Sequence, residues 1–525
     1  MMNHSQTTLG TALVLGLSAG LGIACDAPPD SHQHVDEPPA PVDVTNHAFV
    51  FAPDPVTQPE VQEVLLAAPT TDDGRLTNAY VSALNCLQEA GGTSLFGFAS
   101  LCVEDSTAIP DVDGSYRSIL PPDDFTDGQD AFAQVQMYHH VNVMHDYFKS
   151  TFGFEGLDFP LDAVVNLTLN VQGQWRSFPN AAFMPEESFA AFGLPPRENG
   201  AIMFGQGDDV DFSYDASVIY HEYSHAMVGP ERMNSVTVKE SGLDNTAGAM
   251  NEGVADYFAS TVLDEAYLGP YALGDLGRDL SSSRSCPEDL TTEVHADGKI
   301  IASALWEIRA QLGREVADGL VFRAVQGSSA GTGLDELGEL LRAEAATLGT
   351  DVQAAVEPIL IDHGVLGCVR AKPWVDVDFA TTAEQVPHQV EGTQGAQGGF
   401  PDGMPGYHQW FVDVPAGKAV TLAWSFAPAN GFGAAEPGPV KLALKKGAMV
   451  EVSPTGAIAA DAVVDDAPFA EGAQTITLWG NCTPAEGGRV FLLFVNPNEG
   501  GQGVASMSVE LVDAAPADAV VATCD

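Results

Sequence analysis

The hydrophobic pattern of the chain changes near Lys372, and this change limits the fold more than any other feature. After Asp215 apolar residues recur every three or four positions in five segments, which predicts helices at 215–227, about 248–264, 300–312, about 334–346 and about 352–362. After Lys372 the chain alternates in short runs separated by Gly, Pro and Asn, such as HQWFVDV, AVTLAWSF and RVFLLFV. These runs are typical of a β-sandwich. We therefore expect a helical lobe followed by a separate all-β domain.

The region before Asp215 combines both patterns. Residues 130–150 carry apolar side chains at helical spacing, and residues 164–171 alternate as a strand. Residues 201–204 indicate another strand, with an edge strand at 180–183 between the two. Strands and helices together predict an α+β fold for this part of the chain.

The N-terminus has the pattern of an export signal. Residues 7–24 carry no charge, Cys25 follows, and the next stretch is acidic and rich in Pro. Cys25 with the four residues before it resembles a bacterial lipoprotein processing site, although ordinary cleavage stays open. We expect the protein to be secreted, or held at the bacterial cell envelope by a lipid anchor on Cys25.

The expected organisation follows from these patterns. It comprises a signal at 1–25, a Pro-rich acidic linker at 26–45, an unassigned region at 46–114, an α+β domain at 115–370 and a β-sandwich at 371–525.

Charge and cysteine usage exclude some functions. The chain has 72 acidic and 21 basic side chains, a formal net charge of −51, which opposes binding to nucleic acid phosphates. Apart from Cys25 there are six cysteines and no CxxC pair, so redox or thiolate-metal chemistry is not expected. An even set suits an oxidising compartment. Proximity in sequence suggests the pairs Cys86 with Cys102, Cys286 with Cys368, and Cys482 with Cys524.

The helix that begins after Asp215 carries a metal-binding pattern. Its sequence SVIYHEYSHAMVG contains His221, Glu222 and His225. Histidines four residues apart lie on one helical face, so both rings can reach a single Zn²⁺ with Glu222 beside it. This arrangement suits metal-assisted hydrolysis. An accidental motif on a buried helix is the alternative.

A catalytic zinc ion takes a third protein ligand and keeps one position for water. One common solution needs Gly three residues and His six residues after the second His, but Val228 and Glu231 stand there. The other is a Glu on a following helix, and NEGVADYF supplies Glu252, 27 residues after His225. Asp256, one turn later on the same face, can accept the free ring N–H of a zinc histidine.

The motifs HEYSH, GAMNEGVAD and EVHADGKIIASALWEI, in this order, resemble those of the thermolysin and fungalysin group of zinc metallopeptidases. Their spacing and the last segment are more similar to fungalysin. The resemblance covers roughly Asp130 to Leu366 and implies a thermolysin-like fold, one catalytic Zn²⁺ and hydrolysis of peptide bonds in proteins or peptides.

The resemblance also implies roles for the residues of the zinc site. It implies that His221, His225 and Glu252 are the metal ligands. Glu222 would be the general base, and Asp256 would orient His221.

Further roles concern the substrate. The resemblance implies that His295 stabilises the oxyanion and that an edge strand, which we place at Asn180 and Ala181, pairs with the substrate backbone. It also implies an arginine that holds the substrate carbonyl. Our choice is Arg278, with Arg284 as the alternative.

Other functions stay open. The stretch before the zinc helix is short for the N-terminal β lobe of this group, and no long inhibitory propeptide is evident before Asp130. One alternative is therefore a degenerate peptidase fold that acts as a surface binding or adhesion protein, and another is a zinc exopeptidase. Asp208, Asp209 and Asp211 form either a Ca²⁺ site or a solvated turn. We expect the sandwich to be an accessory module for interaction or targeting.

Overall fold

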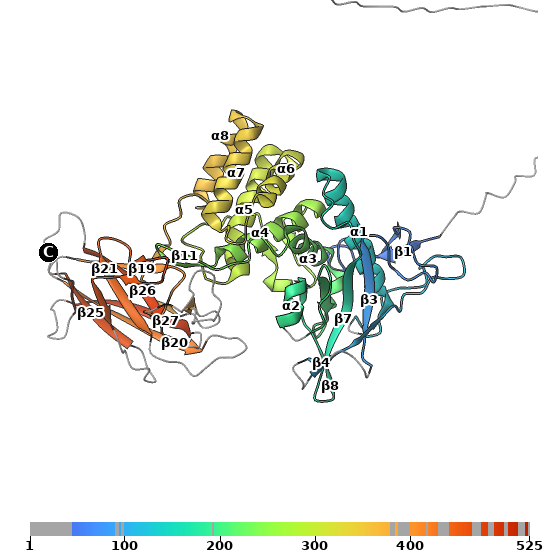
Figure 1. Cartoon of the computed structure of the whole chain (residues 1–525), viewed down its shortest axis with the longest axis horizontal. Helices are drawn as coiled ribbons and strands as arrows, with labels where there is room; N and C mark the ends of the chain where they lie inside the picture. The colour runs from blue at the N-terminus through green and yellow to red at the C-terminus, as the bar shows by residue number, and fades with distance from the viewer. Residues whose placement is uncertain are drawn as a thin grey trace, which may run out of the picture. The chain divides into compact units, whose positions relative to one another are not determined.

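The computed structural model describes residues 45–522 apart from several internal segments, and Figure 1 shows its helices and strands. Outside the described residues lie 1–44, 90–93, 96–98, 126, 192–193, 379–383, 387–399, 401, 416–417, 429–439, 465–473, 481–487, 498–501, 513–519 and 523–525. The expected signal, Cys25 and nearly all of the linker therefore lie outside them, as does the expected pair Cys482 and Cys524. Among the helices of the described residues, none is both long and apolar enough to cross a bilayer.

An eight-stranded mixed sheet dominates the N-terminal part (Figure 1). Its long strand β7 (Leu161–Val171) pairs in parallel with β3 (Val81–Leu87) and with β10 (Ala201–Gly205). The strand β9 (Ala181–Met184) pairs with β10 in antiparallel direction at one edge. The remaining members are β4 (Ser94–Leu95), β5 (Ala99–Leu101), β6 (Val103–Asp105) and β8 (Gln174–Ser177).

The region 46–114, for which the sequence predicted no fold, contributes to this sheet. It supplies β3 to β6, so the sheet contains more strands than the three that the sequence predicted, at 164–171, 180–183 and 201–204. It also forms a separate hairpin of β1 (His47–Val50) and β2 (Gln62–Leu65).

The long helix α1 (Ala131–Phe152) confirms the helix predicted at 130–150. Its N-terminus is capped by the side chain of Asp130, which accepts from the backbone N–H groups of Phe132 and Ala133. Gly153 ends it in the left-handed conformation, with φ 66°. The apolar side chains of α1 are buried in the core that the helix shares with the sheet.

The helical lobe follows the sheet (Figure 1). It consists of α3 (Ala216–Val228), α4 (Thr246–Leu263), α5 (Val294–Leu312), α6 (Arg314–Gln326), α7 (Leu334–Leu348) and α8 (Thr350–Asp362). The short helix α2 (Glu186–Ala191) lies between the sheet strands β9 and β10 in the chain. The sequence did not predict α6. It follows α5 after the single residue Gly313, whose φ of 81° turns the chain between the two helices.

Residues after Ala371 form two six-stranded sheets, which confirms the predicted β domain. One sheet contains β15 (Ala371–Pro373), β18 (Met404–Pro405), β19 (Gln409–Val414), β21 (Lys441–Lys446), β24 (Ala462–Val464) and β26 (Gly488–Asn496). The other contains β16 (Val377–Asp378), β17 (Glu384–Val386), β20 (Ala419–Pro428), β25 (Gln474–Gly480), β27 (Gln502–Val512) and β28 (Val520–Ala522). Side chains of both sheets, including Trp410 and Trp424, share one core.

Two disulfides join segments in the pairing that proximity predicted. Cys86–Cys102 links β3 to the residue between β5 and β6, with the two Cα atoms 5.3 Å apart. Cys286–Cys368 links the loop before α5 to the segment after α8, with Cα atoms 5.7 Å apart.

Candidate active site

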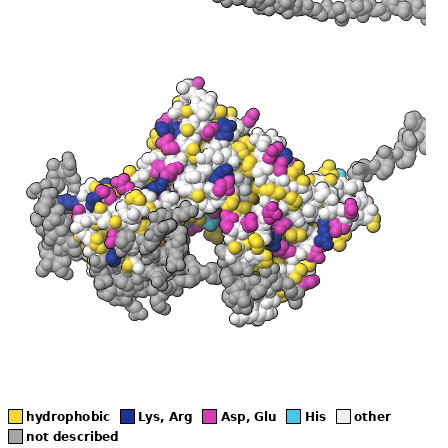
Figure 2. Space-filling model, in the orientation of Figure 1, with side chains coloured by type: hydrophobic (Ala, Val, Ile, Leu, Met, Phe, Trp, Pro, Cys, Tyr) yellow, Lys and Arg dark blue, Asp and Glu magenta, His cyan; other side chains and the backbone are white. Residues whose placement is uncertain are grey.

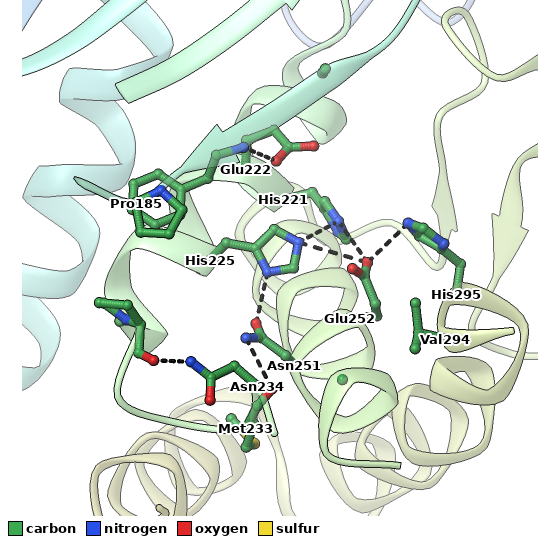
Figure 3. Close-up of a pocket in the computed structure, with 15 residues that line it drawn as sticks. Pro185, His221, Glu222, His225, Met233, Asn234, Asn251, Glu252, Val294 and His295 are labelled. Carbon is green, nitrogen blue, oxygen red and sulfur yellow. Dashed lines mark hydrogen bonds and ion pairs between the residues drawn. The ribbon is translucent and has the colours of Figure 1, made fainter. Parts of the chain in front are cut away.

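A cleft with a cavity of about 330 Å³ lies where β9, α3, α4 and the start of α5 meet (Figure 3). One wall is the edge strand with Ala181, Phe183 and Pro185, and another is the loop after α3. The side chains of His221, Glu222, His225, Glu252 and His295 also line it.

The helix α3 is fixed at its N-terminus. Asp215 is its cap: one carboxylate oxygen accepts from Ser217, and the other accepts from the backbone N–H groups of Tyr271 and Ala272. The carbonyl of Pro53, far away in the sequence, accepts the N–H of Ala216. Two distant segments thus fix the position of the helix that carries the histidines.

Three ligand-type side chains converge in the cleft. The Nε2 atoms of His221 and His225 lie 3.0 Å apart, and Glu252 Oε2 lies 3.2 Å from the first and 3.7 Å from the second. They are the single group of three or more metal-binding side chains found among the described residues.

This group fits a zinc ion. Two ligand atoms about 2.05 Å from a tetrahedral metal lie about 3.3 Å apart, close to the three distances found here. Glu252 Oε2 is buried and has no hydrogen-bond donor within the described chain, although buried carboxylate oxygens normally have partners. A cation between the three atoms would satisfy all of them.

The electrostatics of the group favour positive charge. Burial alone raises the pKa of Glu252, but the nearby imidazoles hold it well below the usual value. Burial lowers the pKa of His225, but the Glu252 carboxylate outweighs this and raises it to about 9. The two shifts have one cause, because the carboxylate and the imidazoles stabilise each other's charged forms.

Asp256 binds the other nitrogen of His221. Asp256 Oδ1 lies 2.8 Å from His221 Nδ1, and Arg278 binds both oxygens of this carboxylate, each at 2.7 Å. Burial raises the pKa of Asp256, but the Arg278 charge outweighs it and the pKa is about 2. An ionised Asp256 accepts the Nδ1 proton and leaves Nε2 free for a metal.

Asn251 does the same for His225, and sequence reasoning missed it. Its Oδ1 lies 2.7 Å from His225 Nδ1 (Figure 3). The only signal in the sequence was its position directly before Glu252 in NEGVADYF. This signal is weak, because adjacent residues on a helix do not share a face.

Glu222 is held against the edge strand. Its Oε2 accepts the backbone N–H of Phe183 at 2.7 Å. In the β9–β10 ladder Gly205 N–H donates to the carbonyl of Asn180, so Ala181 and Phe183 direct their backbone groups away from β10.

The two predicted substrate-pairing residues, Asn180 and Ala181, therefore differ in whether their backbone groups are available to a substrate. Both backbone groups of Asn180 are bonded within the protein, its N–H to Phe178 and its carbonyl to Gly205. Ala181 lines the cleft and lies at the free edge of β9.

His295 lies at the N-terminus of α5. Its Nδ1 bonds to Glu293 at 2.6 Å, and its Nε2 lies 3.5 Å from Glu252 Oε2. The bond to Glu293 is the main cause that raises its pKa, which favours the protonated ring. A protonated imidazole in this position can donate to a negative oxygen.

The remaining candidates lie elsewhere. Arg284 pairs with Asp289, and Arg278 contacts the cleft through Asp256 rather than by lining it. Asp211 accepts from Ser213 and from Gln206, and its neighbours Asp208 and Asp209 are exposed. No tyrosine lines the cleft among the described residues.

Comparison with known families agrees with this geometry. Residues 110–325 match the family described as fungalysin metallopeptidase (M36). The match includes the three ligand-type residues, Glu222, Asp256 and His295. This segment is similar to fungalysin metallopeptidases and has an α+β fold, and a β domain follows it, as the sequence predicted.

Proposed function

We propose that this chain is an exported zinc endopeptidase that hydrolyses peptide bonds in proteins. The observation that supports it best is the convergence of His221, His225 and Glu252 beside Glu222 in an accessible cleft. The fungalysin family match supports peptide substrates and zinc.

His221, His225 and Glu252 would hold the ion. A zinc ion at this point supplies Lewis acidity, which polarises the scissile carbonyl and lowers the pKa of a water toward about 7. Asp256 and Asn251 keep both imidazoles in the tautomer that presents Nε2.

The reaction then uses groups of the chain. Glu222, held by the Phe183 N–H, takes the proton of the attacking water and passes it to the departing amine. His295 donates to the developing oxyanion, a contribution worth roughly 3 kcal/mol in related chemistry. The backbone groups of Ala181 at the free edge of β9 pair with the substrate chain. Arg278, which the sequence suggested as the residue that holds a substrate carbonyl, instead binds both oxygens of Asp256 and does not line the cleft, so its role is to keep Asp256 in place.

The proposal extends to location and to calcium. We propose that residues 1–25 direct export, with either release or a lipid on Cys25. Mass spectrometry of the N-terminal peptide separates these outcomes. A Ca²⁺ ion at Asp208 and Asp209 is tested by calorimetric titration of the zinc-loaded protein.

The variant Glu222→Gln tests the mechanism. It removes the base but leaves the three ligands, so kcat for casein digestion should fall about 10²–10⁴-fold while elemental analysis still finds one zinc. Glu315→Gln, exposed in the first turn of α6 and not part of the cleft, is the matched control and should digest normally. A Glu222→Gln protein that keeps zinc and digests as fast as the wild type would falsify the assignment.

The same assays separate the alternatives. A wild-type protein that binds zinc but digests neither casein nor gelatin would be a binding or adhesion protein. Mass spectrometry of products separates internal cleavage from stepwise removal of terminal residues.

A further inference from the structure

The segment between α3 and α4 is held by the β-sandwich. This segment forms the hairpin of β11 (Thr237–Lys239) and β12 (Gly242–Asp244). The sandwich carbonyl of Gly406 accepts the N–H of Leu243 at 3.0 Å, and Val452 N–H donates to the carbonyl of Glu240 at 2.8 Å. Gln409 Nε2 donates to the carbonyl of Ser241 at 2.9 Å.

Apolar contacts strengthen this attachment. Val238 packs against a cluster of buried sandwich side chains that includes Val450 and Leu493. Leu243 is 1% exposed and belongs to a second cluster with Phe400 and Met404. A hairpin buried on two sides in this way cannot move independently of the sandwich.

The hairpin leads directly into the helix that carries Glu252. Asp244 ends β12, and α4 begins at Thr246, six residues before Glu252. Arg370, the residue directly before the first sandwich strand β15, binds Asp244 at 2.7 Å, and its Nη2 lies 3.3 Å from Thr246 Oγ1. Both charged groups are almost fully buried, at 6% and 2% exposure, so this contact fixes the start of α4.

A second contact fixes the segment before His295. Lys372, in β15, donates to the carbonyl of Leu290 at 2.6 Å. Asp297 then binds the N–H groups of Thr291 and Thr292 at 2.6 and 3.0 Å, which closes the turn that carries His295.

We infer that the β-sandwich is a positioning unit of the zinc site, in addition to any accessory role. It places the Glu252 helix through Gln409 and Arg370, and it places the His295 turn through Lys372. These are positioning residues, because none of them lines the cleft. The expected effect on catalysis rests on the proposed function. The contacts that hold the two segments to the sandwich do not depend on it.

Two variants remove one attachment each. Gln409→Leu leaves the Ser241 carbonyl without its donor and also removes the two bonds of Gln409 to the backbone of Val450 within the sandwich. Lys372→Met leaves the Leu290 carbonyl without its donor. The control is Arg489→Met, because Arg489 pairs with Asp413 inside the same sandwich. All three are made in the full chain.

The first readout is hydrogen exchange of the metal-free protein. We expect amides at 242–252 to exchange about tenfold faster in Gln409→Leu, and amides at 290–297 about tenfold faster in Lys372→Met, with β7 unchanged. Arg489→Met should match the wild type. Protection of the amides in β20 and β27 reports whether the sandwich itself stays folded. If the Gln409→Leu protein loses this protection, the inference is tested on the Lys372→Met protein alone.

The second readout is function. Chelator competition should show about tenfold weaker zinc binding in Gln409→Leu, and Lys372→Met should lower kcat with little change in KM. Exchange and zinc affinity equal to the control in both variants would overturn the inference, even if the wild type is active. A wild type without zinc binding or proteolysis would overturn the proposed function instead, and the exchange data would still decide whether the sandwich holds both segments.

Discussion

Asp211 lies in the turn that leads into α3 and is fully buried. Burial is the main cause that raises its pKa to about 7, and bonds from Ser213 and Gln206 offset only part of this effect. In the unfolded chain an aspartate titrates near pH 3.9. The folded protein therefore holds a proton on Asp211 over a pH range in which the unfolded chain has lost it.

This difference predicts how stability depends on pH. Between about pH 4 and 7 the unfolded state binds fewer protons at Asp211, so its contribution to the free energy of unfolding falls as pH rises through this range. In thermal unfolding of metal-free protein the wild-type Tm should fall from pH 5 to pH 8, and this fall should be smaller by a few degrees in Asp211→Asn. The size follows from a change in Tm of about 2–4 °C per kcal/mol of unfolding free energy. Asp209→Asn, exposed nearby, is the control. Equal slopes in wild type and Asp211→Asn would contradict the prediction.

Residue patterns predicted most of the candidate site but not its supporting contacts. The sequence places two pairs of site residues four positions apart, His221 with His225 and Glu252 with Asp256. Residues four apart lie on one face of a helix, so this spacing predicts which side chains share the site. Asn251 has no such spacing, because its role depends on how α4 rotates against α3. Helix rotation is set by tertiary packing rather than by local sequence.

At the scale of elements, the contact between α4 and α5 depends on glycine. A Cβ atom at Gly253 would lie 2.3 Å from the carbonyl oxygen of Gly298 and 2.3 Å from Ile301 Cγ2. Neither a backbone carbonyl nor a packed Ile side chain can move far. The helices that carry Glu252 and His295 thus approach closely because both contact points lack a side chain.

Gly253→Ala should therefore push the helices apart. We expect a loss of about 1–3 kcal/mol in the free energy of unfolding, measured by denaturant titration, together with weaker zinc binding. The matched control is Gly319→Ala in α6, whose Cβ would meet only the end of the Arg323 side chain at 3.2 Å. That change should be neutral or stabilise by up to about 1 kcal/mol. A Gly253→Ala protein as stable as this control would show that the helices can separate freely.

The elements themselves were predictable only where local pattern determines them. The periodicity of 130–150 and the alternation after Lys372 predicted α1 and the sandwich strands. The strand β3 was not predicted, because it is stabilised by pairing with β7, with Val81 opposite Leu161. Long-range pairing of this kind leaves no local signal.

At the scale of the whole molecule, the formal charge of −51 should influence which peptides approach the cleft. Asp and Glu side chains are spread over the face in Figure 2. Two exposed acids, Glu186 and Glu187, directly follow Pro185 at the wall of the cleft. No Lys or Arg lines the cleft among the described residues. The field at the cleft should therefore attract cationic peptides and repel anionic ones.

Salt dependence measures this field. At 0.1 M salt charges are screened over about 10 Å, so raising salt from low to high concentration should remove most of the attraction. For a peptide with Lys on both sides of the scissile bond, kcat/KM should fall about tenfold, while for the matched Glu peptide it should rise, because both effects act on association. The value of kcat at saturation should stay constant for each peptide. If both peptides respond to salt in the same direction, the response belongs to the enzyme's stability or metal binding, and the acidic surface does not select substrates.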